Sequence, residues 1–600
     1  MAKNPFAIAL SLALIAACGE KPAPVPPAPE GDVMLHTVMD MAKEPPVLNS
    51  HAGDELCSAL QPVYRCFSVI PHGFLLKDLP ESATDQKFSC YPRIKSLPDG
   101  NFIMFYHGGE FGSRVWCTLS SDFKKWSTPQ MLYAPKTVSI DKPDDDVIRY
   151  VNPDAVVLPD GEILLVVSYR AAGHYRQGIG GGLSFRRSKD GGNTWGKAYD
   201  VPVGSNWEPY LLLLPDGTLH CYFTDAIPMT RNSGTGLIIS RDGGKTWSAK
   251  TRVCQQYKYD YFTPGLENQQ YNGQKIYTDQ MPCFRVLNDG KTIAGWLEAR
   301  LEKPVPEDCA NSDTYKSYCM MSLVRNPSLE WEDLTSYEVE RTGPADRETN
   351  VLRGAAGYIS TFPSGEVVLS FNISNRFSLK IGNAAATAWR GERWTDGWMQ
   401  FFDGKGYWGS TEAFGGNFLA IAMHSTSEEV NGMQLGLLYL NHRLDAQRES
   451  ILVDGDAAEW ISTRAFYLGA KNGNDAVIRA AYDDANLYLA VECRDDGSNP
   501  SDLVEVLLKA GEAATFNVKV NAKGLYSSSS PAVTCVARSA KTAEGEPGYV
   551  CELSIPLSAL GVSAGNTLFC YADMVVSGAR IPFTFADLSV PATWQRIQLR

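Results

Sequence analysis

Pairs of apolar, strand-length runs separated by a tight polar turn recur along most of the chain. The clearest turns end at Gly100, Gly161, Gly217, Gly290 and Gly365. A weaker turn occurs at 414–417. A glycine-containing turn between two such runs is typical of a β-hairpin. Six repeating units of this length predict the four-stranded blades of a six-bladed β-propeller over residues 45–445, with an array of β-sandwiches as the alternative.

A second repeat supports the same architecture. Residues 188–195 (SKDGGNTW) and 240–247 (SRDGGKTW) are near copies, and 120–126 (SSDFKKW) is a shortened version. In such a turn the aspartate accepts backbone hydrogen bonds and a glycine adopts a positive φ, while the tryptophan packs into the blade. This repeat indicates a fold and says little about chemistry.

The pattern changes after Leu444. Apolar and polar residues alternate in the runs 451–460, 480–496, 502–509 and 548–561, as they do in half-buried strands. We therefore expect a β-sandwich over residues 446–600. The whole chain is predicted to be all-β, a six-bladed propeller followed by a sandwich.

Composition narrows the possible partners. A chain of 600 residues is too long for one ordinary domain, and its formal net charge of -13 argues against nucleic acid. No apolar run after residue 20 is long enough to span a bilayer. The 14 cysteines and eight histidines show no metal-ligand spacing, so no metal and no cofactor is expected. Disulfide pairing stays open. We expect a monomer.

The N-terminus has the features of a secretory signal: Lys3, a short apolar core, and two small residues before Cys18. Residues 15–18 (IAAC) also resemble the lipobox of bacterial lipoproteins, which implies lipidation at Cys18. A plain signal peptide is the alternative. Residues 1–18 are then the signal and the proline-rich stretch 19–44 is a stiff linker. This predicts a lipid-anchored protein of the bacterial cell envelope, periplasmic or on the cell surface.

A proline stands eight residues before the turn glycine in four units, and it marks the start of the first strand. The first strands of propeller blades surround a central channel. The residues just before these prolines should therefore ring one mouth of the channel: Tyr91, Asn152, Glu208 and Met281.

Counting eight residues past the turn glycine gives Tyr169, Asp225 and Glu298 at the end of the second strands. Glu208 and Glu298 should thus lie at the same height on neighbouring units. Paired carboxylates can cleave a glycosidic bond, one as acid and the other as base or nucleophile, and their separation sets the stereochemistry. Crowded negative charge helps to keep the acid protonated. The alternative is that both glutamates only pair with arginines and brace a binding funnel.

The predicted catalytic residues are Glu208 and Glu298. The predicted substrate-binding residues are Arg93, Asn152, Asp154, Tyr169, Arg170, Trp207, Asp225 and Arg300.

The repeated turns resemble the Asp-boxes of the sialidase superfamily. Within it, residues 207–225 and 279–300 are similar to the exo-arabinanase family of glycoside hydrolases. That resemblance implies release of units from the end of α-1,5-linked L-arabinan with retention, by carboxylates at Glu208 and Glu298. No arabinanase motif follows residue 300.

Sialidases are the second reading. They need an arginine triad for the sugar carboxylate and a tyrosine nucleophile, for which this chain offers Arg93, Arg300 and Arg353, and Tyr407. Only residues 91–94 (YPRI) loosely resemble their first-strand motif. A non-catalytic glycan-binding lipoprotein is the third reading.

The C-terminal region resembles family 9 carbohydrate-binding modules in the order of its motifs. The resemblance implies aromatic sugar stacking, with Trp460, Tyr482 and Trp594 as candidates, although each could equally belong to the core. Asp483 and Asp484 are candidates for calcium or for a turn. The sequence as a whole predicts a surface-anchored glycoside hydrolase that cleaves terminal sugars from a polysaccharide or glycan.

Overall fold

The computed structural model describes residues 33–36, 61–62, 66–71, 89–108, 113–175, 178–227, 232–261, 274–302, 317–335, 343–391, 393–402, 404–415, 418–426, 431–441, 443–462, 465–468, 475–495, 497–581, 588–591 and 594–600. Cys18 and the predicted signal and lipobox lie outside these residues, as does most of the predicted linker. In the part of the chain so described, no helix is long and apolar enough to cross a membrane.

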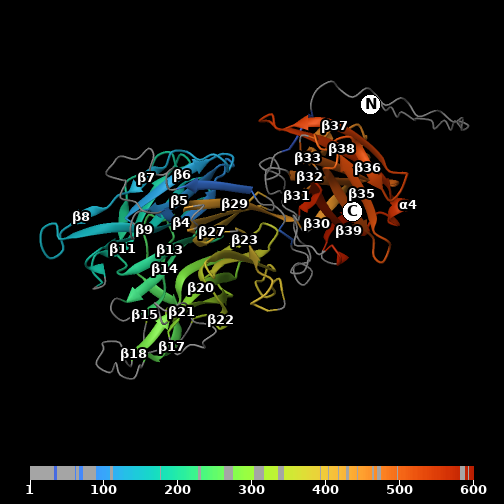
Figure 1. Cartoon of the computed structure of the whole chain (residues 1–600). Helices are drawn as coiled ribbons and strands as arrows, with labels where there is room; N and C mark the ends of the chain where they lie inside the picture. The colour runs from blue at the N-terminus through green and yellow to red at the C-terminus, as the bar shows by residue number, and fades with distance from the viewer. Residues whose placement is uncertain are drawn as a thin grey trace, which may run out of the picture.

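Strands dominate the structure, and the predicted six-bladed propeller is confirmed (Figure 1). Blade one is β4 (Ser89–Ser96), β5 (Phe102–Gly108), β6 (Arg114–Ser120) and β7 (Gln130–Tyr133). Blade two is β9 (Asp146–Val157), β10 (Ile163–Ala171), β11 (Gly181–Ser188) and β12 (Tyr199–Val201), with β8 (Lys136–Val138) added beside β9. Blade three is β13 (Asn206–Leu213), β14 (Leu219–Ile227), β15 (Asn232–Ser240) and β16 (Thr251–Cys254).

The next three blades follow the same order. Blade four is β19 (Gln280–Val286), β20 (Ile293–Glu302), β21 (Ser317–Asn326) and β22 (Asp346–Arg353). Blade five is β23 (Ala355–Thr361), β24 (Val367–Ile373), β25 (Arg376–Gly382) and β26 (Met399–Gln400). Blade six is β27 (Gly406–Phe414), β28 (Phe418–Thr426) and β29 (Asn431–Asn441). A separate hairpin, β17 (Gln256–Tyr261) and β18 (Gln274–Thr278), lies between blades three and four in sequence.

The first strands contact one another in a closed ring, in the order β4, β9, β13, β19, β23, β27 and back to β4. Blade six receives its outer strand from the N-terminal part of the chain, because β3 (Cys66–Pro71) pairs antiparallel with β29, as β2 (Gln61–Pro62) also does. Apolar clusters fill the spaces between successive blades; one, for example, joins Phe105 of blade one to Leu165 of blade two. Packing between blades therefore holds the ring closed.

The repeated polar turns join the third and fourth strands of their blades. Asp190 accepts hydrogen bonds from Ser188 and from the backbone N–H of Thr194, and Asp242 repeats this pattern with Ser240 and Thr246. These turns stiffen the outer part of the blades. The turn at Asp190 lies at the end of the propeller where the hairpin turn of blade one also lies.

The C-terminal strands form the second part of the molecule (Figure 1). Its first half comprises β31 (Ala465–Leu468), β32 (Asp475–Tyr482), β33 (Asn486–Arg494), β37 (Thr534–Lys541) and β38 (Pro547–Pro556). Its second half comprises β34 (Leu503–Lys509), β35 (Phe516–Asn521), β36 (Gly524–Ser528), β39 (Thr567–Val576), β40 (Ala579–Ile581) and β41 (Gln595–Leu599). β30 (Arg443–Arg448) pairs with both halves. Two short helical segments, η4 (Ala458–Ser462) and α4 (Leu557–Leu560), complete it.

Residues from both halves share one core, in which Ile478 and Leu489 meet Val504 and Leu568. This is the sandwich arrangement that alternating strands predict. The aromatic candidates for sugar stacking belong to buried clusters: Trp460, Tyr482 and Trp594 are at most 2% exposed. They are core residues in this structure.

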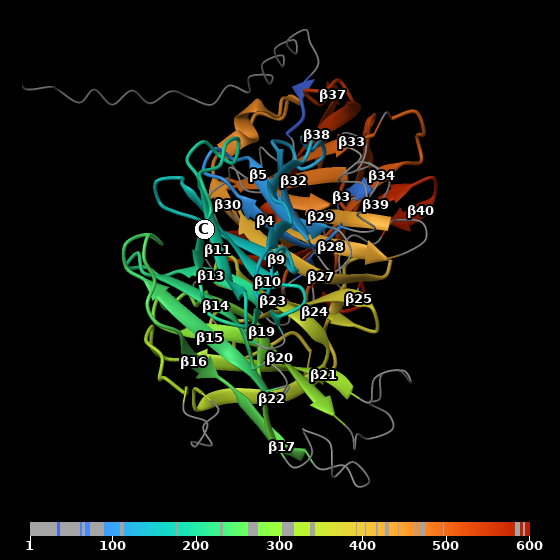
Figure 2. The ribbon, with the colours of Figure 1, turned by 90° about the vertical axis from the view of Figure 1, so that its left-hand side faces the viewer.

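The N-terminal strand β1 (Val33–Met34) belongs to the C-terminal module. It pairs parallel with β37, and Figure 2 shows it beside that strand. His36 adds a buried contact, since both its backbone N–H and its Nδ1 lie within 2.9 Å of Glu492 Oε2. Arg479 holds the other oxygen of the same carboxylate. The chain therefore begins its described path on the module, enters the propeller, and returns to the module.

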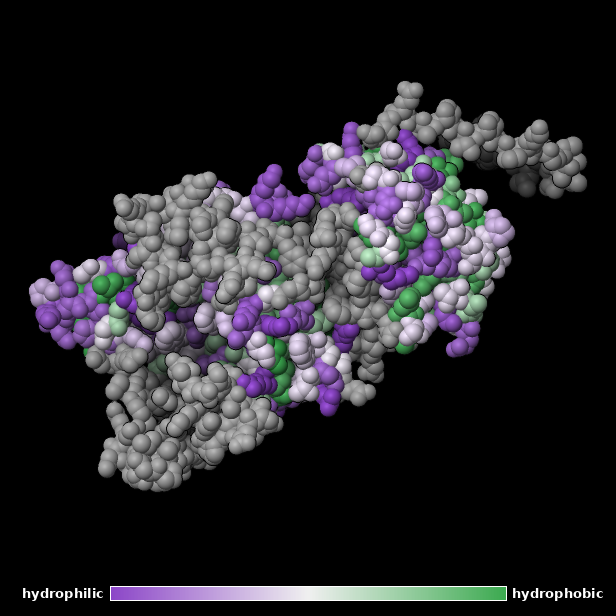
Figure 3. Space-filling view, in the orientation of Figure 1, coloured by the Kyte–Doolittle hydropathy of each residue, from purple (hydrophilic) through white to green (hydrophobic). Residues whose placement is uncertain are grey.

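A further apolar cluster joins the two parts, because Ala465, Tyr467 and Val477 of the module pack with propeller residues such as Ile94 and Phe102. Figure 3 shows small apolar patches interspersed with polar residues over the coloured surface of both parts.

Candidate active site

Each first strand contains a bulge at the end of the channel opposite the hairpin turn; the bulge is near the start of the strand in five blades and in the middle of the longer β9. One residue of each bulge has a positive φ between 44° and 59°, although none of the six is glycine. We call this set the mouth ring: Tyr91, Asn152, Glu208, Met281, Ala356 and Trp408. A proline or a glycine follows each of them. Bulges re-aim a side chain at a cost in backbone energy, so this repeated strain indicates that the mouth has a function.

Side chains from the preceding blade fix four members of the mouth ring. The acceptors are His107 Nδ1 for Asn152, Thr224 Oγ1 for Met281, Glu298 Oε2 for Ala356 and Asn372 Oδ1 for Trp408, each bonded to the backbone N–H at 2.8–3.1 Å. Each acceptor lies on the second strand of its blade, across from the residue that precedes the bulge. Neighbouring blades are thus joined by hydrogen bonds at the mouth as well as by apolar packing.

Glu208 is partly buried in β13, and Thr224 Oγ1 donates to its Oε2 at 2.7 Å. Thr224 accepts the N–H of Met281, so its one proton is directed at Glu208. Burial raises the pKa of Glu208 to about 7, and the charge of Glu298 acts in the same direction. The Thr224 hydrogen bond and the charges of Arg170 and Arg93 oppose this rise. Glu208 can therefore exchange a proton near neutral pH.

Glu298 lies in β20 of the neighbouring blade and is 5% exposed. Gln280 Nε2 donates to its Oε1 at 2.7 Å, and Cys319 Sγ lies 3.2 Å from the same oxygen. The N–H of Ala356 donates to Oε2 at 2.8 Å. Donors therefore meet both oxygens, as suits an ionised carboxylate. The adjacent residues Gln280 and Met281 connect the two glutamates, because one bonds to Glu298 and the other to the threonine that holds Glu208.

Arg170, Trp207 and Asn152 form the neighbouring wall of the mouth. The guanidinium carbon of Arg170 lies 3.2 Å from the centre of the Trp207 ring, and its Nη2 donates to Asn152 Oδ1 at 3.3 Å. Burial lowers the pKa of Arg170 to about 10, against the opposing charge of Glu208. Stacking and hydrogen bonding together orient this cation beside Glu208.

Arg93 and His107 support the mouth ring through hydrogen bonds to its backbone. Arg93 is 4% exposed; its guanidinium lies 3.7 Å from the Tyr91 ring centre, and its Nη1 donates to the carbonyl oxygens of Pro92 and Trp408. Burial, together with the charges of Arg170 and Arg93, lowers the pKa of His107 to about 3, so this imidazole is neutral. Both residues hold the backbone of the mouth ring.

Three predicted positions lie away from this group. Asp154 is fully buried: it accepts the N–H of Leu211 at 2.8 Å and faces Lys95 at 3.5 Å, so it braces blades two and three below the mouth. Asp225 forms ion pairs with Arg252 at 2.7 Å and Lys250 at 2.8 Å inside blade three.

Tyr169 is the third. Burial raises its pKa to about 12, and its hydroxyl lies over Gly182 on the next strand of its blade.

Tyr169 and Asp225 lie one position away from the place equivalent to Glu298, because the hairpin of blade four is one residue longer. In blade three Leu214 N–H bonds to Thr218, one residue after the turn glycine; in blade four Leu287 N–H bonds to Thr292, two residues after it. The residue of blade three that is equivalent to Glu298 is therefore Thr224. In blades with the shorter hairpin, the equivalent residue comes seven positions after the turn glycine, so a count of eight goes one residue too far. Arg300 lies in β20, where its backbone pairs with Cys319 of β21, and its side chain lies outside the described residues.

Several residues of the site were not predicted from the sequence: Thr224, Gln280, Cys319 and His107. Gln280 occupies the place of Trp207 before the bulge, and Thr224 directly precedes the predicted Asp225. An alignment of the units by hairpin length would have found both.

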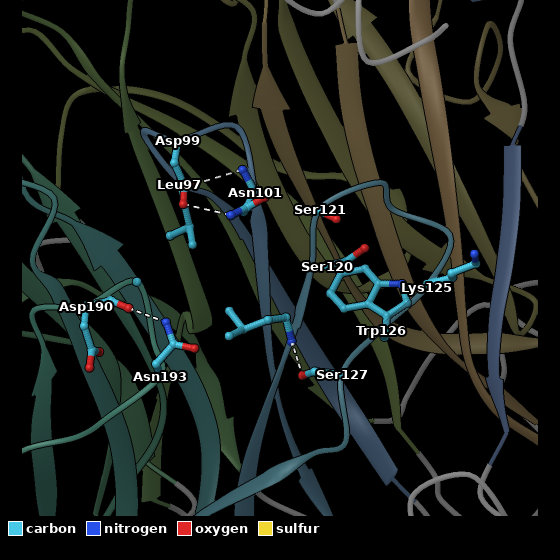
Figure 4. Close-up of a pocket in the computed structure, with 12 residues that line it drawn as sticks. Leu97, Asp99, Asn101, Ser120, Ser121, Lys125, Trp126, Ser127, Asp190 and Asn193 are labelled. Atoms are coloured by element: carbon cyan, nitrogen blue, oxygen red, sulfur yellow. Dashed lines mark hydrogen bonds between the residues drawn. The ribbon is translucent and has the colours of Figure 1, made fainter. Parts of the chain in front are cut away.

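Two other features lie elsewhere. A pocket of about 460 Å³ opens at the hairpin-turn end of blades one and two, and among the residues that line it Asn101 Nδ2 donates to Asp99 Oδ2 (Figure 4). Asp141, Asp145 and His174 are the only group in the described part of the chain close enough to share a metal ion. Asp145 there accepts three backbone N–H bonds, and His174 pairs with two aspartates. The pocket lies at the opposite end of the propeller from the mouth, and His174 directly precedes Tyr175, whose ring centre lies 6.1 Å from that of Trp207.

In the C-terminal module, Asp483 accepts the N–H groups of Ala485 and Asn486, which is the turn role considered for it. Asp484 pairs with Arg448.

No protein-family model and no curated protein matches the chain. The solved structures similar to it include arabinanases, a trans-sialidase and a carbohydrate-binding module. A protein of unknown function from Dyadobacter fermentans has 14% identity and a TM-score of 0.42, over 64% of this chain and 99% of that chain.

An α-L-arabinanase from Penicillium chrysogenum, complexed with arabinobiose, has 17% identity and a TM-score of 0.39, over 63% and 98% of the two chains. A family 9 carbohydrate-binding module from Caldicellulosiruptor kristjanssonii, in complex with cellotriose, has 18% identity and a TM-score of 0.22, over 26% and 93%. At these values the likeness concerns the chain trace, and the chemistry is inferred from the site's own residues.

Proposed function

We propose that the protein is a glycoside hydrolase whose active site is the propeller mouth. The supporting observation is the pair Glu208 and Glu298, which come from adjacent blades and are connected by hydrogen bonds through the bulge of β19; the charge of Glu298 also raises the pKa of Glu208. Glu208 would donate the proton to the leaving oxygen, and Glu298 would act as the carboxylate partner. The Thr224 proton already occupies Oε2 of Glu208, so the catalytic proton belongs on Oε1. Arg170 and Trp207 would orient the sugar.

The substrate we propose is the end of a neutral polysaccharide, with α-1,5-linked L-arabinan as the first candidate and retention as the stereochemical outcome. The test uses purified full-length protein with an aryl α-L-arabinofuranoside, linear α-1,5-arabinan and sialyllactose. Release of arabinose would support the proposal, and the first-formed anomer, observed by NMR, would decide between retention and inversion. Release of sialic acid instead would favour the sialidase reading.

A non-catalytic glycan-binding protein is the second candidate. The observation that favours it is the position of Glu298, which accepts a backbone N–H where other blades use threonine, histidine or asparagine. Glycan binding without cleavage of any substrate in the panel would support this candidate.

The proposed acid predicts the pH dependence. Because the pKa of Glu208 is raised to about 7, kcat/KM should fall as pH rises through about 7, when the proton is lost. Between its ordinary value of 4.5 and about 7, the folded state binds a proton that the unfolded state releases. Stability should therefore decrease as pH rises across that window, and Glu208→Gln should remove this dependence. A pH–rate profile and thermal unfolding at several pH values check both. A wild-type rate that stays level up to pH 9 would contradict the assignment of the acid.

Thr224 offers a sharper test of the same group. Thr224→Val removes the donor to Glu208, so the pKa of Glu208 should rise further and the alkaline limb should move to higher pH. Thr224→Ser keeps the hydroxyl and should leave the limb in place. The valine also leaves the N–H of Met281 without this acceptor, and it should lower the unfolding free energy by about 1–3 kcal/mol. Identical pH profiles for the two variants would show that Thr224 does not tune Glu208.

A further inference from the structure

Trp408 differs from the rest of the mouth ring in its exposure. Its side chain is 37% exposed, whereas Tyr91, Asn152, Met281 and Ala356 are buried and Glu208 is partly buried. In the closed ring of six blades, blade six stands opposite blade three. Trp408 therefore occupies, across the channel from Glu208, the position equivalent to that of the proposed acid.

The surroundings of Trp408 hold it in place. Asn372 Oδ1 accepts its N–H at 3.1 Å, and Arg93 Nη1 donates to its carbonyl oxygen at 3.1 Å. Its ring is parallel to that of His424, with 6.3 Å between the ring centres and 3° between the planes. Its φ of 48° is strained for a large side chain. An exposed aromatic ring kept in a strained, fixed orientation across the channel from Glu208 is a pre-organised binding surface.

We propose that Trp408 is the platform on which an uncharged sugar ring of the substrate stacks. This inference rests on the proposed hydrolase function and assigns to it the surface that binds the sugar. The C–H face of a sugar is apolar and its rim carries hydroxyl groups, which suits an aromatic ring with polar groups across the channel.

The two arginines that the structure places at the mouth also favour an uncharged sugar. Arg93 donates to backbone carbonyl oxygens and is nearly buried, and Arg170 stacks on Trp207 and bonds to Asn152. A sugar carboxylate is best bound by a guanidinium that presents two free N–H donors side by side. Arg93 and Arg170 are only 4% and 7% exposed, so little of either guanidinium reaches the channel.

The test measures binding apart from cleavage. In the full-length Glu208→Gln background, arabinotriose, xylotriose and 3′-sialyllactose are titrated by isothermal calorimetry. We expect at least one neutral trisaccharide to bind, and Trp408→Ala to raise its Kd about tenfold. The matched control is Trp398→Ala: Trp398 is also 37% exposed but lies beside β26 at the outer edge of blade five, so its Kd should change by no more than about twofold. Trp408→Tyr should restore most of the affinity.

Any of three results would overturn the inference. The first is an equal effect of Trp408→Ala and Trp398→Ala, and the second is no binding of either neutral sugar. The third is tighter binding of sialyllactose than of the neutral sugars. Its failure differs from that of the hydrolase proposal: arabinan cleavage by the wild type that is unchanged in Trp408→Ala refutes only the platform. Binding that depends on Trp408, combined with a wild type that cleaves no substrate in the panel, refutes only the hydrolase.

Discussion

Glu208→Gln is expected to lower kcat on an aryl α-L-arabinofuranoside by about 10²- to 10⁴-fold, the contribution of a positioned general acid. Glutamine keeps the size of the side chain, and its amide oxygen can still accept the Thr224 hydroxyl proton. The variant therefore loses the exchangeable proton and keeps the contacts. Steady-state kinetics and a thermal melt on the same preparation measure the two effects separately.

The matched control is Glu412→Gln. Glu412 is also a carboxylate near the channel, but it belongs to blade six and pairs with Arg285 at 3.2 Å and Lys95 at 3.9 Å. Its replacement should affect stability more than kcat. Full activity in Glu208→Gln, or an equal loss in both variants, would remove Glu208 from the catalytic role.

Glu298→Gln should lower kcat by a similar factor, about 10²- to 10⁴-fold, because it removes the second carboxylate while an amide oxygen still accepts the N–H of Ala356. Glu298→Ala should lower kcat as much, and should also lower the unfolding free energy by about 1–3 kcal/mol, since that N–H then lacks this acceptor. Comparing the two variants separates the chemical role of Glu298 from its role in joining blades four and five. An active Glu298→Gln combined with an unstable Glu298→Ala would assign Glu298 to structure alone.

The fold was predictable because its markers are local. Turn glycines such as Gly217 have a positive φ of 85°, and the hydrophobic runs on either side pair as hairpins. The prolines predicted four members of the mouth ring, because proline cannot donate to the hydrogen-bond ladder of a sheet and is therefore found beside a bulge, where that ladder is interrupted. Glu208 was identified in this way.

The features that the sequence did not predict have separate physical causes. In blades five and six, Gly357 and Gly409 follow the bulge residue in place of proline, so Ala356 and Trp408 carried no marker. Counting along the chain also assumes that all hairpins have the same length. The hairpin of blade four is one residue longer, so the count of eight that reaches Glu298 goes one residue past the equivalent position in blades two and three and gives Tyr169 and Asp225. Alternation alone could not show that Trp460 and Trp594 lie inside the module, because core and surface aromatics fit the same pattern.

The path of the N-terminal segment also affects how fast the chain can fold. Val33 pairs with Ala540 and Ile70 pairs with Met433, so both closures join residues that are hundreds of positions apart. Contacts of such high sequence separation require costly loop closure, and they make folding slow. Blade six cannot be completed until β29, which ends at Asn441, is present, and the edge of the module cannot be completed until β37, which ends at Lys541, is present. A truncation at either end would therefore expose an unpaired strand edge in a part of the molecule remote from the cut, where it would promote aggregation.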